Sequence, residues 1–366
     1  MKKRPEHVTP DLDSALTINE GVVQPPTVNV HSVAHFRNKI KRNKPASEYI
    51  AGILDGNRTL LSQAITLVES SRADHQAIAR EIVEKCMPHS GKSFRIGITG
   101  VPGVGKSSFI ESFGMHLTSI GRKVCVLAID PSSEKSKGSI LGDKTRMEQL
   151  SVNPDAFIRP SPSAGSLGGV ARKTRETIIL CEAAGFDTVF VETVGVGQSE
   201  TVVHSMTDFF LLLMLAGAGD ELQGIKRGIM EMADTMVITK ADGTNVDKAN
   251  QARVQYQNAL HLFPKTESGW VPKVLTCSAH NNIGIPAIWD TMADYLNETK
   301  AINYLDTRRA QQAKYWMYES INESLLNDFY HQDQISQAIP AIEKQLHNRT
   351  LSSYEASRQL LELYRK

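Results

Sequence analysis

Residues 96–107 read Ile-Gly-Ile-Thr-Gly-Val-Pro-Gly-Val-Gly-Lys-Ser and fill every fixed position of the pattern G-x-x-x-x-G-K-[ST], which is typical of a phosphate-binding loop. An apolar run over residues 94–99 leads into the loop and predicts a strand. After the loop, apolar residues recur at helical spacing as far as Gly121, a typical C-terminal cap, which predicts a helix. The apolar residues of that predicted helix face are Phe109, Ile110, Phe113, Leu117 and Ile120.

The composition of this loop predicts how it binds phosphate. Backbone N–H groups of the glycines can surround phosphate oxygens, and the helix N-terminus adds the positive end of its dipole. Lys106 would reach the β- and γ-phosphates, and the Ser107 hydroxyl would bind Mg²⁺. The residues expected to bind nucleotide here are Gly100, Val101, Pro102, Gly103, Val104, Gly105, Lys106, Ser107 and Ser108.

Bulk composition argues against several classes of protein. Lys+Arg 41 against Asp+Glu 40 gives a net charge of +1, which predicts no general attraction to nucleic acid or membrane. The four cysteines form no C-x-x-C pair, so neither a zinc site nor a disulfide framework is expected. The longest apolar run, residues 209–216, is far shorter than the ~20 residues of a transmembrane helix. We therefore expect a soluble, cytoplasmic protein.

Hydrophobic patterning predicts an α/β fold with helical extensions. Residues 1–45 are polar and weakly patterned, as expected of a flexible arm, and residues 46–90 form an N-terminal helical extension. Residues 91–298 alternate apolar runs with helices, which predicts a P-loop NTPase domain with a doubly wound, mostly parallel sheet. Residues 299–366 are helical and aromatic-rich, as in a dimerisation module, with packing on their own core as the alternative. The predicted strands are 94–99, 124–129, 188–192, 209–215, 236–239 and 273–277.

Two short motifs further along the chain indicate the base. Thr239-Lys240-Ala241-Asp242 ends one predicted strand and matches the [NT]-K-x-D motif of GTPases. The Asp242 carboxylate would accept from guanine N1–H and N2–H₂, while the Lys240 stem stacks along the base. Ser278-Ala279 follows the next predicted strand and matches the second base-contact motif, where a backbone N–H meets guanine O6. Together the motifs predict that guanine is the base.

Acidic residues at two predicted strand ends are candidates for the metal and the γ-phosphate. Asp130 follows the second strand, and Glu192 ends the third, where Glu replaces the usual Asp of D-x-x-G. Gly195 is placed to donate its N–H to the γ-phosphate. The next residue is Val196 and not the glutamine that orients attacking water in small GTPases, and Gln198 lies two residues further on. We therefore expect slow hydrolysis without a partner.

Three loops resemble switch segments in composition. Residues 138–147 are glycine-punctuated and bring Asp143 and Arg146 close together in the sequence. Residues 216–228 follow the most apolar strand, and residues 161–169 are rich in Ser and Gly. For each of them an ordinary connecting loop is the alternative reading.

Longer strings resemble the MeaB/ArgK family of P-loop GTPases, which includes the methylmalonic aciduria type A protein. Thr239 and Ala216 depart from the residues usual in that family, Asn and Pro. The matching stretches are residues 100–107, 130–133, 141–147, 159–163, 167–172, 192–200 and 217–228.

This resemblance implies a homodimeric GTPase, using GTP/GDP and Mg²⁺, that acts as a chaperone of an adenosylcobalamin-dependent acyl-CoA mutase of the methylmalonyl-CoA mutase type. It would gate cofactor loading and protect the mutase from inactivation. By position, Asp130 and Glu192 become sensors of metal and γ-phosphate. The segment 216–226, with Asp220, Glu221 and Lys226, becomes the switch loop toward the mutase.

Other functions compete with this one. A P-loop ATPase for amino-acid (lysine, arginine, ornithine) uptake is disfavoured because Asp242 selects guanine. A nickel-delivery GTPase would need Cys/His clusters near the switches, whereas Cys125 and Cys181 fall in an apolar strand and helix. A small-molecule kinase would need an acceptor pocket and lid arginines, which the sequence does not reveal.

Overall fold

The strands form a seven-stranded parallel sheet in the order β3-β2-β4-β1-β5-β6-β7. The computed structural model describes residues 44–129, 147–161, 167–193, 199–217, 227–264 and 266–365. Within these, Pro45 onward forms one compact unit. The strands are β1 (Phe94–Gly100), β2 (Val124–Ile129), β3 (Ala156–Ser161), β4 (Thr188–Thr193), β5 (Phe209–Leu215), β6 (Thr235–Thr239) and β7 (Lys273–Thr276).

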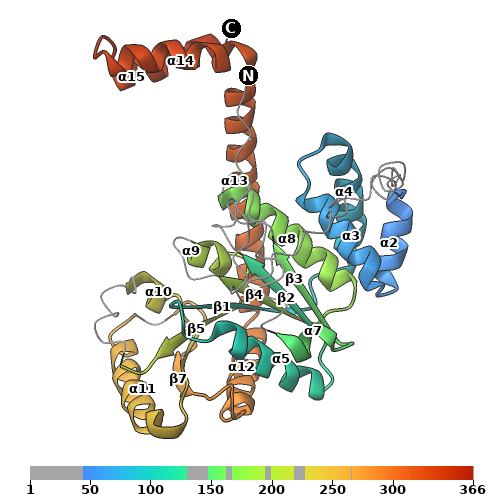
Figure 1. Cartoon of the computed structure of the whole chain (residues 1–366), viewed down its shortest axis with the longest axis vertical. Coiled ribbons are helices and arrows are strands. Elements are labelled where there is room, and N and C mark those ends of the chain that lie inside the picture. The colour runs from blue at the N-terminus through green and yellow to red at the C-terminus, as the bar shows by residue number, and fades with distance from the viewer. Residues whose placement is uncertain are drawn as a thin grey trace, which may run out of the picture. The chain divides into compact units, whose positions relative to one another are not determined.

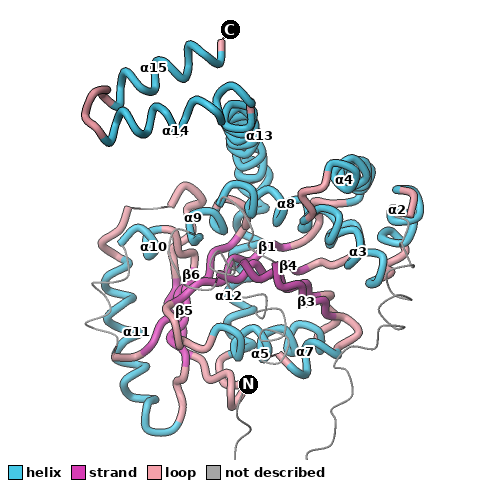
Figure 2. The backbone as a smooth tube through the Cα atoms, turned by 45° about the horizontal axis from the view of Figure 1, so that its top comes forward, coloured by secondary structure: helices cyan, strands magenta, loops and turns pink. Residues whose placement is uncertain are grey.

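Helices cover both faces of this sheet (Figure 2). Those of the nucleotide-binding part are α5 (Lys106–Ser119), α7 (Glu148–Val152), α8 (Leu167–Ala183), α9 (Ser199–His204), α10 (Arg227–Glu231), α11 (Val246–Leu260) and α12 (Ile285–Ala301). Those of the flanking parts are α2 (Ala46–Leu54), α3 (Arg58–Glu69), α4 (Ala73–Cys86), α13 (Tyr304–His331), α14 (Asp333–His347) and α15 (Ser353–Tyr364).

Alternating side chains on each strand supply two cores. Val124 and Val126 pack with α5 and α12 on one face, whereas Cys125 and Leu127 pack with α8 and the α2–α4 helices on the other. Because both faces are buried, the strands are largely apolar, as is typical of parallel sheets. The doubly wound P-loop fold predicted from the sequence is confirmed.

The helix after the phosphate loop follows its predicted pattern with one exception. Phe109 and Phe113 are fully buried, and the Phe113 ring stacks on Phe190 of β4 with centroids 5.4 Å apart. Gly121 has φ +85° and its N–H bonds the Thr118 carbonyl, so it ends the helix as expected. The prediction for Ile120 was wrong, because this C-cap residue is 49% exposed.

One strand escaped the sequence prediction. β3 pairs with β2 at the edge of the sheet, and it contains Arg159 and Pro160. Proline is tolerated there because an edge strand needs hydrogen bonds on one side only. The segment 161–169 is likewise not all loop, since α8 begins at Leu167, while residues 162–166 lie outside the described part.

The terminal helices attach to the sheet differently. The α2–α4 helices pack on α8, and the Arg58 guanidinium donates to the Asn153 carbonyl before β3. The long helix α13 contacts both α12 and α8, then carries α14 and α15 at its far end (Figure 1). Among the helices described here, none is long and apolar enough to cross a membrane.

Candidate nucleotide site

Two glycines give the phosphate loop its path. Gly105 is the N-cap residue of α5 with φ +91°, a left-handed conformation that favours glycine. At Gly100, where β1 ends, a Cβ atom would lie 2.5 Å from the Leu213 carbonyl oxygen of β5, so only glycine fits. The loop thereby turns directly from the central strand into a helix N-terminus. Pro102, Gly103 and Ser108 are exposed, which leaves the loop accessible to a ligand.

Lys106 is the first residue of α5 and its side chain is folded back over the loop. The Nζ donates to the Gly100 carbonyl at 2.8 Å, and the residue is only 9% exposed. Burial lowers the pKa of this amine, while the carboxylates of Glu192 and Glu200 oppose that shift. The charge therefore lies where an anion would compensate its desolvation.

The carboxyl end of β4 brings an acid beside the loop. Glu192 is buried and is in register with Ile98 of the adjacent β1, while the Thr193 and Thr99 hydroxyls are 2.8 Å apart. Ser107, one residue into α5, is half-buried. A hydroxyl and carboxylates together with phosphate oxygens are ligands that Mg²⁺ prefers, so these residues fit that ion. The described residues hold no group of three or more His, Cys, Asp or Glu side chains that could bind a metal unaided.

The end of β6 contacts the phosphate loop directly. The Thr239 hydroxyl donates to the Val104 carbonyl at 2.7 Å, and Lys240 Nζ donates to the Gly103 carbonyl at 2.8 Å. Lys240 itself has φ +54°, and Asn245 holds its carbonyl through a 2.7 Å hydrogen bond from the side-chain amide. The two predicted motifs, far apart in the sequence, are thus one connected structure.

The Asp242 carboxylate is held from the next strand end. The Ser278 hydroxyl, following β7, donates to Asp242 Oδ2 and accepts from the Asn281 N–H at 3.2 Å. Asp242 and Ala279 are half-buried, so both remain reachable by a base. Asn282, at φ +54°, accepts from the Ser112 hydroxyl of α5. Ser112 and Asn282 therefore tie the base loop to the phosphate-loop helix, a role that their sequence context alone did not reveal.

Several predicted site residues cannot be placed. The residues that lie outside the described part are Asp130, Asp143, Arg146, Gly195, Val196, Gln198, Asp220, Glu221 and Lys226. What the structure does place together, at the carboxyl ends of β1, β4, β6 and β7, are the phosphate loop, Glu192 and both base motifs. Ligands of open α/β sheets bind at this edge.

Comparison with known proteins identifies the family. Residues 61–334 match the family described as methylmalonyl Co-A mutase-associated GTPase MeaB. The chain belongs to the MeaB family of GTPases. It is 46% identical over 316 residues to GTPase ArgK of Escherichia coli, covering 86% of this chain and 96% of that protein. To the mitochondrial methylmalonic aciduria type A homolog of Mus musculus it is 43% identical over 335 residues, covering 89% and 81%.

A solved structure supports the same assignment. The crystal structure of a LAO/AO transport system kinase has a TM-score of 0.70 and 40% identity, covering 88% of this chain and 98% of that one. The MeaB match includes every placed residue of the site and ends within α14. The chain is accordingly a P-loop GTPase, and guanine nucleotide binding follows from the family.

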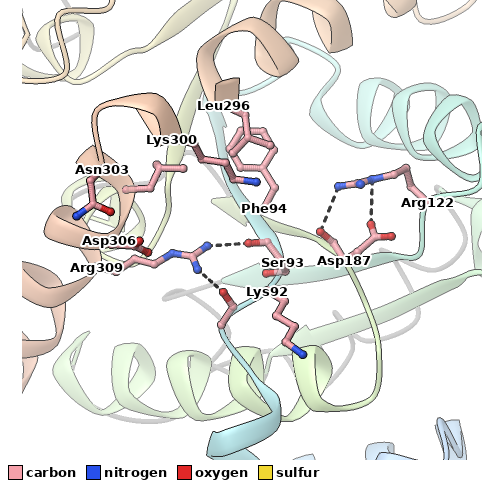
Figure 3. Close-up of a pocket in the computed structure, with 12 residues that line it drawn as sticks. Lys92, Ser93, Phe94, Arg122, Asp187, Leu296, Lys300, Asn303, Asp306 and Arg309 are labelled. Carbon is pink, nitrogen blue, oxygen red and sulfur yellow. Dashed lines mark hydrogen bonds and ion pairs between the residues drawn. The ribbon is translucent and has the colours of Figure 1, made fainter. Parts of the chain in front are cut away.

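In this MeaB-family chain a separate pocket of about 450 Å³ lies at the amino ends of the strands, beside the start of β1 (Figure 3). There the Arg122 guanidinium pairs with Asp187 at 3.0 Å, and Arg309 donates to the Gly91 and Ser93 carbonyls. Arg309 also pairs with Asp208, which accepts the Arg95 N–H. These contacts fix α13 against the amino ends of the strands, away from the nucleotide site.

Proposed function

We propose that this chain is a GTP-binding and GTP-hydrolysing chaperone of an adenosylcobalamin-dependent acyl-CoA mutase of the methylmalonyl-CoA mutase type, whose cofactor loading it gates and which it protects. The observation that carries the nucleotide part is the direct contact between the phosphate loop and the base motif through Thr239 and Lys240. The mutase part is supported by the family's description and by the name of the mouse relative.

Each residue of the predicted nucleotide site has a proposed role toward GTP. Lys106 neutralises the β- and γ-phosphate oxygens, and backbone N–H groups of the phosphate loop, Pro102 excepted, hold them. Ser107, Asp130 and Glu192 would hold Mg²⁺, which would neutralise charge developing on the phosphates. Lys240 and Asp242 hold guanine, with Ser278 orienting the carboxylate and Ala279 offering its N–H. Gly195 donates to the γ-phosphate.

Partner dependence follows from Val196. Without a glutamine at that position the attacking water is poorly oriented, so hydrolysis is slow until a partner repositions the loops. The proposed switch elements are Asp143, Arg146, Gln198, Asp220, Glu221 and Lys226.

The cognate mutase should therefore raise the rate of GTP hydrolysis by one or two orders of magnitude, about 1.4–2.7 kcal/mol of barrier. Steady-state phosphate release with and without the mutase measures this. Asp220→Ala and Lys226→Ala should respond less than the wild type, while Lys85→Ala, an exposed lysine on α4, should respond fully. A wild-type rate that the mutase leaves unchanged, or loop variants that respond like the wild type, would refute the switch proposal.

We also propose that residues 299–366 form a homodimer interface, next to a GTPase domain over 91–298 and helices over 46–90. On α13 the side chains of Tyr318, Leu325 and Leu326 are each more than half exposed. Apolar residues of α13, α14 and α15 also line a pocket of about 660 Å³. Contiguous exposed apolar surface of this kind often marks a protein–protein contact. Light scattering should give two copies for the wild type and one for Leu326→Glu; a monomeric wild type would contradict the proposal.

A further inference from the structure

A third pocket, smaller than the two described above, lies where α13 crosses α8. Its volume is about 290 Å³, at the lower end of the range of small-molecule sites, so its ligand must be small. It is bordered by α8, α13, the start of β1 and the link between α9 and β5. It is lined by Met87, Ser90, Arg95, Arg175, Ile178, Ile179, Ser205, Met206, Arg309, Gln312, Ala313 and Trp316.

Two of the three arginines in this pocket are neutralised within the protein. Arg95 binds Glu182 through Nε at 2.8 Å and through Nη2 at 2.9 Å. Arg309 binds both oxygens of Asp208 and also donates to the backbone carbonyls of Gly91 and Ser93, as Figure 3 shows from the neighbouring pocket. These two guanidinium groups hold the walls of the pocket together.

The third arginine, Arg175 of α8, is different. Its Nε is buried and has no hydrogen-bond partner among the described residues. The guanidinium carbon lies over the Trp316 ring of α13, 4.3 Å from the ring centroid. Burial lowers the pKa of Arg175 to about 10, partly offset by the carboxylates of Glu176 and Glu323. A buried N–H group without an acceptor is costly, because it has lost its hydrogen bond to water and gained none in the protein.

Much of the remaining pocket lining is apolar. Half of the lining residues are Met, Ile, Ala or Trp, from η1 (Met87–His89), α8, α13 and the α9–β5 link, while Ser90, Ser205 and Gln312 add polar groups. A guanidinium recognises carboxylates through two parallel N–H bonds, and apolar walls favour a short hydrocarbon body. We propose that this pocket binds a small aliphatic carboxylate, with Arg175 as its anion partner. This inference is independent of the proposed GTPase and chaperone function.

The position of the pocket predicts what binding does to the fold. Trp316 Nε1 donates to the Ser205 carbonyl at 3.1 Å, and Gln312 donates to the Thr207 carbonyl at 2.9 Å. The pocket thus lies at the contact between α13 and the segment that follows α9. A ligand that bridges Arg175 and this contact binds only the folded arrangement, so it should raise the melting temperature by mass action.

Calorimetric titration of the full chain with butyrate tests the proposal, with GDP at saturation so that the phosphate loop is occupied. We expect one butyrate per chain with a dissociation constant below about 1 mM. Arg175→Gln should weaken binding at least about tenfold, because the charge-assisted pair is lost. Arg172→Gln is the matched control. The Nε of Arg172 is also buried without a hydrogen-bond partner, but this arginine does not line the pocket, and its Nε lies 3.8 Å from Glu176 Oε1. This control should bind like the wild type.

Two further comparisons separate the contributions of charge and shape. Butyramide, a neutral analogue of the same shape, should bind at least tenfold more weakly than butyrate. Inorganic phosphate, an anion without a hydrocarbon body, should also be weaker. If Arg175→Gln fails to fold, Ala313→Leu narrows the pocket without changing its charge and should weaken butyrate as well. No saturable binding below about 1 mM, or equal binding by wild type and Arg175→Gln, would overturn the proposal.

Discussion

Replacing Lys106 with alanine should lower the rate of GTP hydrolysis by about a hundredfold or more, since removal of one preorganised donor to a developing charge has that effect. The affinity for GDP and GTP should fall at least about tenfold, because buried charge-assisted contacts contribute roughly 1.5–3 kcal/mol each. Phosphate release measures the first effect and calorimetry the second. The fold should survive, since Lys106 Nζ bonds only carbonyls of its own loop.

Lys92, just before the start of β1, offers a matched control. Lys92 precedes β1 and is exposed, so Lys92→Ala removes a lysine without touching the phosphate loop. It should bind and hydrolyse GTP like the wild type. If Lys106→Ala bound both nucleotides with unchanged affinity, the phosphates would have to bind elsewhere, and the loop would not be the nucleotide site.

Local patterns predicted most of the strands of the sheet, because each of these strands is encoded by a short apolar stretch of sequence. The phosphate loop, its strand and its helix are set by neighbouring residues, and both faces of the sheet are apolar. β3 was missed because its pattern is short and contains Arg159 and Pro160. Arg159 instead pairs across to Glu69 of α3, a contact between residues far apart in the chain. Such pairs leave no local signal.

Amphipathic patterns located helices better than they located buried faces. In the sequence, Leu54 falls on one apolar stripe of residues 47–87 and Leu61 and Ile65 on a second; Leu61 and Ile65 are fully buried, whereas Leu54 at the end of α2 is 41% exposed. Residues 303–330 carry a helical apolar pattern with Tyr315, Trp316, Tyr318, Ile321, Leu325 and Phe329, and of these only Trp316, which packs beside Arg175, is buried. Periodicity states which residues share a face, and not which partner covers it.

The candidate site was predictable as motifs but not as a network. The residue types of the base motif indicated guanine, yet the contacts that join it to the phosphate loop depend on backbone conformation. Lys240 and Asn282 both adopt positive φ, which few non-glycine residues do. Asn282 has a recognisable cause, since Asn tolerates that region and Gly284 follows in the same turn. Nothing in the local sequence predicts the positive φ of Lys240. Its contacts with Gly103 and Asn245 stabilise that conformation.

Asp242→Asn should change the base preference of the site. In the proposed complex the wild-type carboxylate accepts from both donors of guanine, whereas Asn would offer an N–H₂ donor that suits the 2-oxo group of xanthine. A mismatched buried polar pair costs on the order of 1–3 kcal/mol, so GTP should weaken by roughly 5- to 150-fold. Xanthosine triphosphate should bind the variant more tightly than it binds the wild type. Competition binding of GTP, ATP and xanthosine triphosphate measures the change.

Ser278→Ala separates base choice from positioning. The Ser278 hydroxyl donates to the Asp242 carboxylate, and in our proposal it does not contact guanine itself. Its loss should therefore lower the affinity for GTP without raising the affinity for xanthosine triphosphate. Adenine lacks the two donors that a carboxylate accepts, and the wild type should therefore discriminate strongly against ATP. A wild type that bound ATP as tightly as GTP would favour the ATPase alternative. If Asp242→Asn kept the wild-type preference, guanine would have to be selected by backbone groups such as the Ala279 N–H.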